Sequence, residues 1–492
     1  MTTRVQARSK INKADNNADA DVIVLGVGTA GEDISLQLLH AGLEVVGIEA
    51  NLVGGECPYW ACLPSKLMIR MAKALKEARW IGEVAADVEV TPDWRPVAEK
   101  VRWLTGEWDD SGAIERYENR GGRLIKGYGK LVGPRTVAVG DERFTARRGI
   151  VIATGSKPFI PPIEGLDEVD YWTTHDAIAM EEVPESMIVI GGGSSGCELG
   201  QVAAQFGADV TIVEANEHLL PGEEPEASEL LEGAFAAEGM EVRTGATAER
   251  FASRDGSIVV TLDNGEALTA ERVLVATGRT VDLSDLGLES AGLDSNAPFL
   301  EVDEHMRAAD GIWAIGDITG KAFLSLVGLY QSKIAAADIL GKAHAAARYD
   351  AIPQVVFSEP EVGSVGMTES EAREAGRDIV TAVKQLPATF AGMVHMLERG
   401  ILKVVVDRES GLLLGATVAG PQAGNLLGLL NLAVHAQVPL AKLENMMYGF
   451  PALYSGLGEG LGGYARAGVI SVMDPEYQGL ERLENVGKSA LI

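Results

Sequence analysis

The chain has 492 residues, with 71 acidic against 42 basic residues, a formal net charge of −29 and 58 glycines. This length predicts about three domains, and the acidic excess argues against non-specific binding of nucleic acid or of an anionic membrane, which both require positive surface. Three cysteines are too few for a disulfide-stapled secreted scaffold and are consistent with a reducing compartment.

The N-terminal segment, residues 1–19, is polar and lacks the apolar stretch of a secretory signal. We expect it to form a disordered leader. No run of about 18 uncharged apolar residues occurs in the sequence, so we expect no membrane-spanning helix. Together these features predict a soluble cytoplasmic protein.

A strand–helix–strand unit follows the leader, at residues 21–49. Its first, β-branched run leads into Gly26, Gly28 and Gly31, and its second strand ends at Glu49. In such a unit the first glycine makes a tight turn, the second lets the backbone approach a pyrophosphate, and the third lets helix and strand pack closely. The acid accepts hydrogen bonds from a ribose diol. The segment therefore predicts a dinucleotide site.

The same unit occurs again at residues 187–214, with Gly191, Gly193 and Gly196 followed by Glu214. The acid follows the first glycine by 23 residues in both copies. Two copies indicate two dinucleotides, or one dinucleotide and its electron donor. A carboxylate at position 214 would repel a 2′-phosphate, and no arginine follows it closely, which favours NADH over NADPH.

Two cysteines lie directly after the first unit, Cys57 and Cys62 in the segment GGECPYWACLPSK. In a regular helix, residues five apart are separated by about 7.5 Å along the axis, too far for a comfortable disulfide. If the two pair, the first turn must be irregular, which Pro58 at a helix start permits. The alternative is two small buried residues in a reduced protein. Beside a dinucleotide site we favour the redox interpretation.

This segment resembles the redox-disulfide motif GGxCxxxxCxPSK of the class I pyridine nucleotide–disulfide oxidoreductases, which include dihydrolipoamide dehydrogenase, glutathione reductase and mercuric reductase. The resemblance covers almost the whole chain after the leader. Further matches are the ATG turns at 153–156 and 276–279, GIWAIGD at 311–317, and VVFSEPEVGSVGMTE at 355–369. The resemblance implies an α/β fold with two Rossmann-like dinucleotide-binding domains and an α+β C-terminal dimerisation domain.

The implied organisation is an FAD-binding domain in two parts, an NAD-binding domain between them, and a C-terminal interface domain that makes a homodimer. The boundaries are 20–158 and 286–348 for FAD, 159–285 for NAD, and 349–492 for the interface.

The resemblance also implies site residues, position by position. FAD would be held by Gly26, Gly28, Gly31, Glu49, Gly129, Thr154, Gly155, Ser156, Asp317, Phe323, Leu324, Ser325 and Leu326. NADH would be held by Gly191, Gly193, Gly196, Glu214 and Gly278. We identify no metal ligands.

The implied catalytic residues are Cys57, Cys62, Lys66 and Glu198. In the family, hydride passes from nicotinamide to FAD and two electrons pass on to the disulfide. Cys62 would form the charge-transfer thiolate, and Cys57 would attack the acceptor. Lys66 would lie near flavin N5, where a cation stabilises the anionic reduced flavin, and Glu198 would pair with it.

One family signature is absent. Thiol-reducing members carry His-Pro-Thr-x-x-Glu near the C-terminus, where the partner subunit's histidine is the general acid–base and the glutamate orients it. Here Phe450 and Ser455 occupy those two positions. The nearest histidine, His435, lies in a predicted helix, and we favour a helix residue without catalytic role over a replacement base. Mercuric reductases carry a similar Phe-Pro but add a C-terminal cysteine pair, whereas this sequence ends NVGKSALI. The departure argues against ordinary disulfide substrates.

We therefore predict an FAD-dependent oxidoreductase that passes electrons from NADH through a Cys57–Cys62 disulfide to a small-molecule acceptor. An activated disulfide, a metal ion or an electrophile would suit it. The alternatives are an NADH:quinone-type or metal-ion reductase that uses the flavin directly, and a non-enzymatic flavin redox sensor. Tyr59 and Trp60 could stack a planar acceptor or simply pack, and we favour packing.

Overall fold

The computed structural model describes residues 18–456 and residue 458. These residues divide into two compact units, the first formed by described residues up to 59, 105–157 and 279–347, the second by 60–104, 158–278 and the described residues from 348 onward. Most of the predicted leader and the end of the predicted C-terminal domain lie outside the described residues. The predicted domain boundaries remain a prediction.

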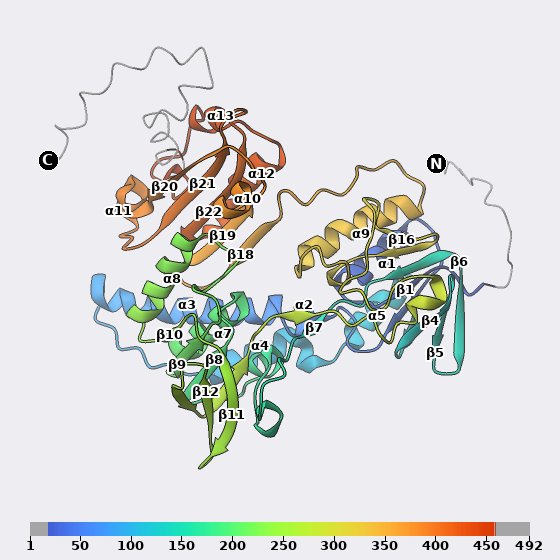
Figure 1. Cartoon of the computed structure of the whole chain (residues 1–492), viewed down its shortest axis with the longest axis horizontal. Coiled ribbons are helices and arrows are strands. Elements are labelled where there is room, and N and C mark those ends of the chain that lie inside the picture. Colours follow the sequence, from blue (N-terminus) through green and yellow to red (C-terminus); the bar gives the residue numbers. More distant parts are fainter. Residues whose placement is uncertain (1–17, 457, 459–492) are drawn as a thin grey trace, which may run out of the picture. The chain divides into compact units, whose positions relative to one another are not determined.

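The first unit contains a mostly parallel sheet in the order β16-β17-β6-β1-β2-β3, with β4 and β5 joined to it through β6 (Figure 1). Strand β1 is central and pairs in parallel with β2 and β6. Its residues from Ile23 to Leu25 are buried, because helices cover both faces of such a sheet and select β-branched, apolar runs. The strands are β1 (Ala20–Leu25), β2 (Val45–Glu49), β3 (Arg123–Lys126), β4 (Gly129–Gly133), β5 (Thr136–Val139), β6 (Glu142–Ile152), β16 (Arg307–Ala309) and β17 (Ile312–Ala314).

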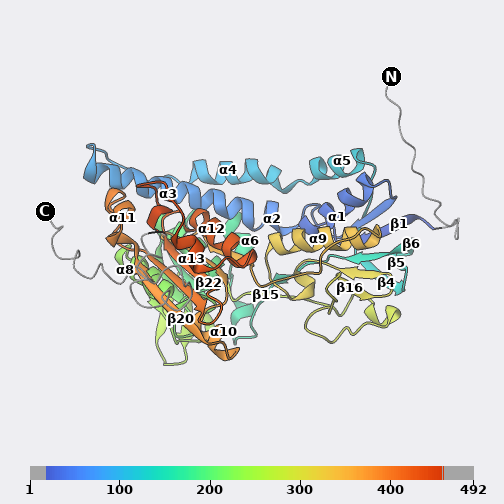
Figure 2. The same cartoon turned by 90° about the horizontal axis from the view of Figure 1, so that it is seen from above.

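Helices α1 and α9 of this unit lie side by side (Figures 1 and 2). In α1, Gly31, Ile34, Ser35 and Leu38 are buried at helical spacing, which gives the helix one packed face. The helices are α1 (Thr29–His40), α2 (Glu56–Tyr59), α5 (Ser111–Asn119) and α9 (Ser325–Ile339), with 3-10 turns η1 (Gly106–Trp108), η3 (Leu288–Ala291) and η4 (Asp317–Thr319).

The second unit contains a parallel sheet in the order β10-β9-β8-β14 and a three-stranded antiparallel sheet, β11-β12-β13. Helix α7 packs against α3, and the Arg79 guanidinium donates to the side chain and the carbonyl of Gln205. The elements are α3 (Cys62–Val84), α4 (Arg95–Thr105), η2 (Leu166–Glu168), α6 (Thr174–Ile178), β8 (Ser186–Ile190), α7 (Ser194–Gln205), β9 (Asp209–Val213), α8 (Pro225–Ala237), β10 (Glu241–Arg243), β11 (Ala248–Arg254), β12 (Ser257–Leu262), β13 (Ala267–Ala270) and β14 (Arg272–Val275).

A five-stranded antiparallel sheet, β18-β19-β22-β21-β20, forms the C-terminal part of the second unit. The amphipathic helix α12 packs on it, with Leu426, Leu427 and Leu430 in the shared apolar core. The elements are β18 (Pro353–Val356), β19 (Glu361–Gly366), α10 (Glu369–Glu374), β20 (Ile379–Gln385), η5 (Leu386–Ala388), α11 (Phe390–Val394), β21 (Ile401–Asp407), β22 (Leu413–Gly420), α12 (Ala423–His435) and α13 (Leu440–Glu444). Short strands β7 (Lys157–Pro158) and β15 (Arg279–Thr280) lie where the chain passes between units.

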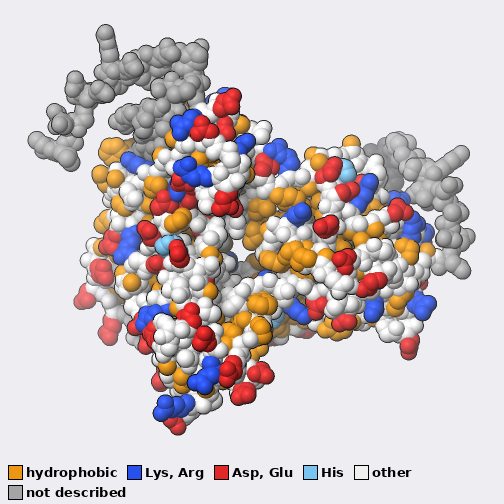
Figure 3. All heavy atoms as spheres, viewed as in Figure 1, with side chains coloured by type: hydrophobic (Ala, Val, Ile, Leu, Met, Phe, Trp, Pro, Cys, Tyr) orange, Lys and Arg blue, Asp and Glu red, His pale blue; other side chains and the backbone are white. Residues whose placement is uncertain are grey.

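The predicted α/β fold class is confirmed, because each unit contains one of the two strand–helix–strand copies on a parallel sheet. In the described part of the chain, no helix combines the length and apolar character needed to cross a membrane. On the face shown in Figure 3, acidic and basic side chains are interspersed, so the net charge of −29 does not gather there into one patch.

Candidate dinucleotide sites and redox segment

The first glycine turn has no room for side chains at two of its glycines. Gly26 has φ +91°, and a Cβ there would lie 2.4 Å from the carbonyl oxygen of Ala153. A Cβ on Gly31 would lie 1.9 Å from the carbonyl oxygen of Gly26. Both contacts are with backbone and cannot relax by side-chain rotation. The turn therefore has the close strand–helix packing that the sequence predicts.

Gly28 stands at the N-cap of α1, and no side chain caps the helix there. The backbone of Gly55 runs beside it, so that a Cβ on Gly55 would lie 2.8 Å from the Gly28 Cα. The first-turn amides of a helix lack intrahelical acceptors and attract anions. This turn therefore offers its N–H groups to a phosphate beside Gly55, a position where a side chain has no room.

The acid of the first copy, Glu49, is held by its own turn. Its carboxylate accepts hydrogen bonds from the backbone N–H of Val27 at 2.6 Å and of Asn51 at 2.8 Å. Burial raises the pKa of Glu49, and these two amide hydrogen bonds act in the opposite direction. Each carboxylate oxygen keeps a second lone pair, so the group can still accept from a ribose diol.

The second copy repeats this geometry on β8, α7 and β9. Gly191 has φ +109°, and a Cβ on Gly196 would lie 1.9 Å from the Gly191 carbonyl oxygen. The carboxylate of Glu214 accepts from the N–H of Gly192 at 2.7 Å and of Asn216 at 2.8 Å. A Cβ on Gly193 would meet nothing within 4 Å, and Gly193 caps α7 without a side-chain hydrogen bond. The predicted internal repeat thus extends to individual hydrogen bonds.

A polar network in the first unit surrounds Asp317, which follows β17. The hydroxyl of Ser156 donates to the Asp317 carboxylate at 2.5 Å. The Arg279 guanidinium donates to the Ser156 hydroxyl at 2.7 Å and to its carbonyl at 2.9 Å, and it lies 3.3 Å from Glu56. Burial raises the pKa of Asp317, while the Ser156 hydrogen bond and the Arg279 charge lower it.

The remaining residues predicted for the first dinucleotide belong to this same unit. Gly129 opens β4, where a Cβ would lie 2.4 Å from a methyl of Leu25, and Thr154 with Gly155 follows the end of β6. Phe323 and Leu326 are partly exposed at the start of α9. Because β1, β2, β6 and β17 run in parallel, the turns after their carboxyl ends lie at one edge of the sheet. In the second unit, Gly278 follows β14 with φ +109° and open space around it.

The helix is interrupted between the two redox-segment cysteines. Cys57 lies in the short helix α2, Cys62 is the first residue of α3, and Ala61 between them has the non-helical angles φ −141°, ψ −100°. The irregular turn that pairing would require is therefore present. Both cysteines are half-buried. The third cysteine, Cys197, is fully buried, its thiol donates to the Gly192 carbonyl, and burial raises its pKa.

The predicted pairing of Lys66 with Glu198 is present. The Lys66 Nζ lies 2.7 Å from one carboxylate oxygen of Glu198, and the other oxygen accepts from the N–H of Phe357 at 2.8 Å. Nζ also lies 5.1 Å from the centre of the Phe357 ring, a cation–π distance. The catalytic role of the pair stays a prediction.

The aromatic residues of the redox segment pack against the protein. Trp60 stacks on His175 of α6, with ring centres 4.8 Å apart and planes 17° from parallel. Tyr59 is buried, and its carbonyl accepts from the Trp108 indole N–H at 3.3 Å. These contacts support the packing interpretation over the planar-acceptor alternative.

Comparison with known proteins shows the family. Residues 20–348 match the family described as pyridine nucleotide-disulphide oxidoreductase, and residues 352–459 match its dimerisation domain. The chain belongs to this family. It is 34% identical to a dihydrolipoyl dehydrogenase of Thermus scotoductus, with 89% of this chain and 96% of that one covered, and 32% identical to a mercuric reductase of Bacillus cereus, with 90% and 71% covered.

Solved structures agree with the fold. The HOCl-induced flavoprotein disulfide reductase RclA from Escherichia coli superposes with a TM-score of 0.80 at 24% identity, covering 90% of this chain and 99% of that one. LpdA from Mycobacterium tuberculosis gives a TM-score of 0.80 at 25% identity, with 89% of this chain and 98% of that one covered.

As a member of the pyridine nucleotide-disulphide oxidoreductase family, the chain is an FAD-dependent oxidoreductase that uses a pyridine nucleotide.

The oxidoreductase departs from the thiol-reducing signature in structure as well as in sequence. Phe450 is largely exposed and packs edge-on against Phe390, with ring centres 5.4 Å apart. Ser455 is buried, and its hydroxyl has no hydrogen-bond partner among the described residues. His435 ends α12. The segment that corresponds to the acid–base signature of the thiol-reducing members therefore supplies no such pair among the described residues.

Three residues that support the family site escaped the sequence analysis. The sequence marks Arg279 only as the end of an ATG turn, although it anchors Ser156. The Gln331 side chain accepts from the N–H of Gly316 at 2.6 Å and holds the turn before Asp317. Asp110 accepts from the N–H of Val53 at 2.8 Å and so fixes the loop before the redox segment. Arg279 could have been found from its place after a motif, but Asp110 and Gln331 carry no local signal.

Proposed function

We propose that this chain is an NADH-dependent flavoprotein reductase that delivers electrons to a small acceptor through Cys57 and Cys62. The observation that supports this most is the coincidence of two matched dinucleotide turns with two half-buried cysteines separated by a break in the helix. Two cysteines with a purely structural role would not require a break in the helix between them. A second dinucleotide turn is expected when one dinucleotide passes electrons to another.

The first unit has the features of an FAD site. The uncapped N-terminus of α1 suits a pyrophosphate, Glu49 suits a ribose diol, and Asp317, held by Ser156, suits the hydroxyls of a ribityl chain. Gly129, Thr154, Gly155 and the stretch 323–326 complete the proposed set. When bound, FAD accepts a hydride from a nicotinamide and supplies two electrons to a disulfide.

The second unit has the features of a site for NADH. Gly193 leaves open space at the N-terminus of α7, and the carboxylate of Glu214 would repel a 2′-phosphate on a ribose bound to it. Arg243, on the neighbouring strand β10, is held by Glu241 and Glu266 and is therefore neutralised. Flavin reduction in stopped flow by each nucleotide tests this preference, and faster reduction by NADPH would overturn it.

The cysteines supply the chemistry at the acceptor. Once the disulfide has taken up two electrons and the cysteines are thiols, the Cys57 thiolate attacks one sulfur of a disulfide acceptor and expels the other as a thiolate. Cys62 then attacks Cys57, which releases the second thiolate and re-forms the disulfide. Because position 450 is not a histidine, the expelled thiolate receives no proton from the protein there. Acceptors with stable leaving groups, or metal ions, therefore suit this site best.

We propose a homodimer formed through the C-terminal domain. The matched dimerisation domain and a set of solvent-exposed apolar side chains support it. These side chains are Phe390, Met393, Val394, Leu432, Met447 and Phe450. Light scattering on the eluting protein should give twice the chain mass of 52.0 kDa, and a monomer at micromolar concentration would contradict the proposal.

The decisive experiment measures NADH consumption with a panel of disulfides, quinones and metal ions. The Cys57→Ser, Cys62→Ser double variant should lose turnover with the best acceptor, whereas the buried Cys197→Ser control should keep it. Full turnover in the double variant would favour direct reduction by the flavin instead. Negligible turnover of the wild type with every acceptor, together with a partner that binds only one redox state, would favour a sensor.

A further inference from the structure

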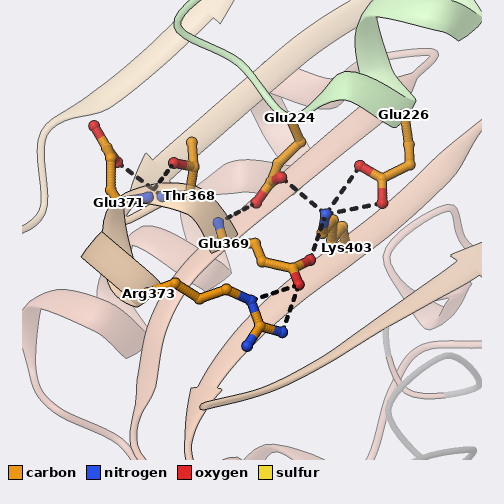
Figure 4. Close-up of polar contacts among 7 residues, drawn as sticks. All are labelled: Glu224, Glu226, Thr368, Glu369, Glu371, Arg373 and Lys403. Carbon is orange, nitrogen blue, oxygen red and sulfur yellow. Dashed lines mark hydrogen bonds and ion pairs between the residues drawn. The ribbon is translucent and has the colours of Figure 1, made fainter. Parts of the chain in front are cut away.

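A buried lysine in the second unit holds three carboxylates (Figure 4). The Nζ of Lys403, on β21, lies 2.8 Å from Glu224, 2.8 Å from Glu226 and 3.0 Å from Glu369. The Lys403 side chain is only 4% exposed. Arg373 forms a second ion pair, with Glu369 at 2.7 Å. This cluster joins the start of α8, which belongs to the nucleotide-binding part, to α10 and β21 of the dimerisation domain.

The cluster carries an excess of negative charge. Its three carboxylates face two cations, so one negative charge is uncompensated before its neighbours are counted. Placing a further carboxylate beside this cluster is costly unless that group is neutral, because like charges in a partly dry environment repel strongly.

Glu223 is that further carboxylate. One of its oxygens accepts from the Ser364 hydroxyl at 2.9 Å, while the other is buried and has no hydrogen-bond partner among the described residues. Burial raises the pKa of Glu223 to about 7, with Glu224 and Glu371 adding to the effect and Ser364 opposing it. The charged and titratable groups around this segment are Glu224, Glu226 and Glu232 with His218, then Glu369, Glu371 and Arg373 of α10, and Lys403 of β21.

Two backbone hydrogen bonds connect Glu223 to the second glycine turn, and a third continues from that turn to Glu214. The N–H of Glu223 donates to the Leu220 carbonyl at 2.8 Å, and the N–H of Leu220 donates to the Gly192 carbonyl at 2.9 Å. The N–H of Gly192 in turn donates to the Glu214 carboxylate at 2.7 Å. The Leu219 side chain packs over Gly192, where a Cβ would meet it at 2.5 Å. Residues 219–224 therefore form a brace behind the nucleotide turn.

We propose that Glu223 is a positioning residue that makes nucleotide affinity depend on its protonation. When Glu223 is neutral, the brace stays docked on β19 through Ser364 and holds Gly192 and Glu214 in place. When Glu223 ionises, its second carboxylate oxygen must be hydrated, and the neighbouring carboxylates of the Lys403 cluster repel it. The brace then loosens, and the nucleotide binds more weakly. This inference rests on the proposed nucleotide role of the Gly191–Gly196 turn.

The direction with pH follows from the raised pKa. A carboxyl whose pKa is higher in the folded state than in the unfolded chain stabilises the folded arrangement at low pH, and loses that effect as pH rises through the folded value. Nucleotide affinity should therefore be highest below pH 7 and fall above it.

Calorimetric titration of NAD⁺ into the oxidised holoenzyme at pH 6 and pH 8 tests the proposal. Wild-type affinity should fall at least about threefold between the two, whereas Glu223→Gln, which is neutral throughout, should keep the pH 6 affinity at both. The exposed Glu229→Gln variant on α8 is the matched control and should show the wild-type fall. Ser364→Ala, which removes the Ser364 hydrogen bond that favours the ionised form, should move the fall to higher pH.

The outcomes separate two failures. Wild-type binding that is equal at both pH values, or a pH-dependent fall that persists in Glu223→Gln, overturns the role of Glu223 alone. Absence of NAD⁺ binding at pH 6 overturns the proposed nucleotide site and this inference with it. Hydrogen exchange of the Leu220 amide, corrected for its intrinsic rate, gives a readout without nucleotide, and its protection should fall between pH 6 and 8 only when Glu223 can ionise.

Discussion

Lys66 and Glu198 form an ion pair in which only the carboxylate is hidden from solvent. The two atoms lie 2.7 Å apart, with the Glu198 side chain 4% exposed and that of Lys66 36% exposed. A lone buried carboxylate is costly, whereas a half-exposed ammonium is not. The stability of this part of the second unit therefore depends on Lys66 more than the exposure of Lys66 suggests.

A double-mutant cycle should show this asymmetry. Lys66→Met leaves the Glu198 charge unpaired and should cost about 1–2 kcal/mol, a figure reduced for the solvent screening of Lys66. Lys66→Met combined with Glu198→Gln should recover most of that loss, because the neutral amide oxygen at that position would still accept from the N–H of Phe357. Denaturant unfolding of the holoenzyme measures the free energies. A double variant that is less stable than Lys66→Met alone would contradict the argument.

Alanine at two glycines of one turn should separate stability from binding. Gly196→Ala forces a Cβ to 1.9 Å from the Gly191 carbonyl and should cost about 3 kcal/mol of folding free energy. Gly193→Ala meets nothing within 4 Å and should change stability by less than about 1 kcal/mol. In the proposed nucleotide site its methyl would stand where a pyrophosphate approaches, so NAD⁺ affinity should fall by about tenfold or more. Thermal unfolding and calorimetry measure the two effects, and unchanged affinity in Gly193→Ala would argue against the site.

Flavin retention should become more sensitive to acid when Ser156 is replaced. The Ser156 hydroxyl opposes the burial that raises the pKa of Asp317, so Ser156→Ala should raise that pKa further. If the carboxylate form holds FAD, protonation releases it, and the midpoint of release should move to higher pH in the variant. Flavin fluorescence during acid titration gives the midpoint. Ser284→Ala, beside the exposed Asp282, is the control and should leave the midpoint unchanged.

A histidine at position 450 should restore part of the missing acid catalysis. Phe450 is largely exposed, so Phe450→His should fold normally. Turnover with a simple disulfide such as lipoamide should rise by about tenfold, below the usual range of about 10²–10⁴ because Ser455 cannot orient the imidazole. The pH profile of NADH oxidation should gain an inflection near about pH 6.5. An equal gain in Phe450→Gln would show that the effect is not acid catalysis.

The motifs predicted the parts of this site whose residues are fixed by backbone sterics. At Gly31 and Gly196 an added Cβ would lie 1.9 Å from a backbone carbonyl oxygen, so only glycine fits. The spacing of these glycines can therefore be recognised in the sequence. The Lys66–Glu198 pair came from the family resemblance, since the two positions are 132 residues apart and neither is marked locally.

The side-chain networks could not be predicted in this way. Lys403 and Glu224 are 179 residues apart, and their burial depends on how α8 packs against the five-stranded sheet that contains β21 and β22. The stacking of Trp60 on His175 likewise depends on tertiary packing, which is why the sequence left both a planar acceptor and packing open. Polar residues that pair across such long sequence separations produce no hydrophobic periodicity or motif in the sequence around either partner.

The repeated hydrogen bond from each glycine turn to its own acid has a consequence for attempts to redesign the coenzyme preference. A small neutral residue in place of Glu214 would be the simplest way to accept a phosphorylated ribose. The same exchange would remove the hydrogen-bond acceptor of the Gly192 N–H. If Glu214 sets the proposed NADH preference, specificity and turn geometry are tied to one side chain. A successful exchange would need a replacement acceptor, such as a serine or asparagine, together with a cation released from the Glu241–Arg243–Glu266 group.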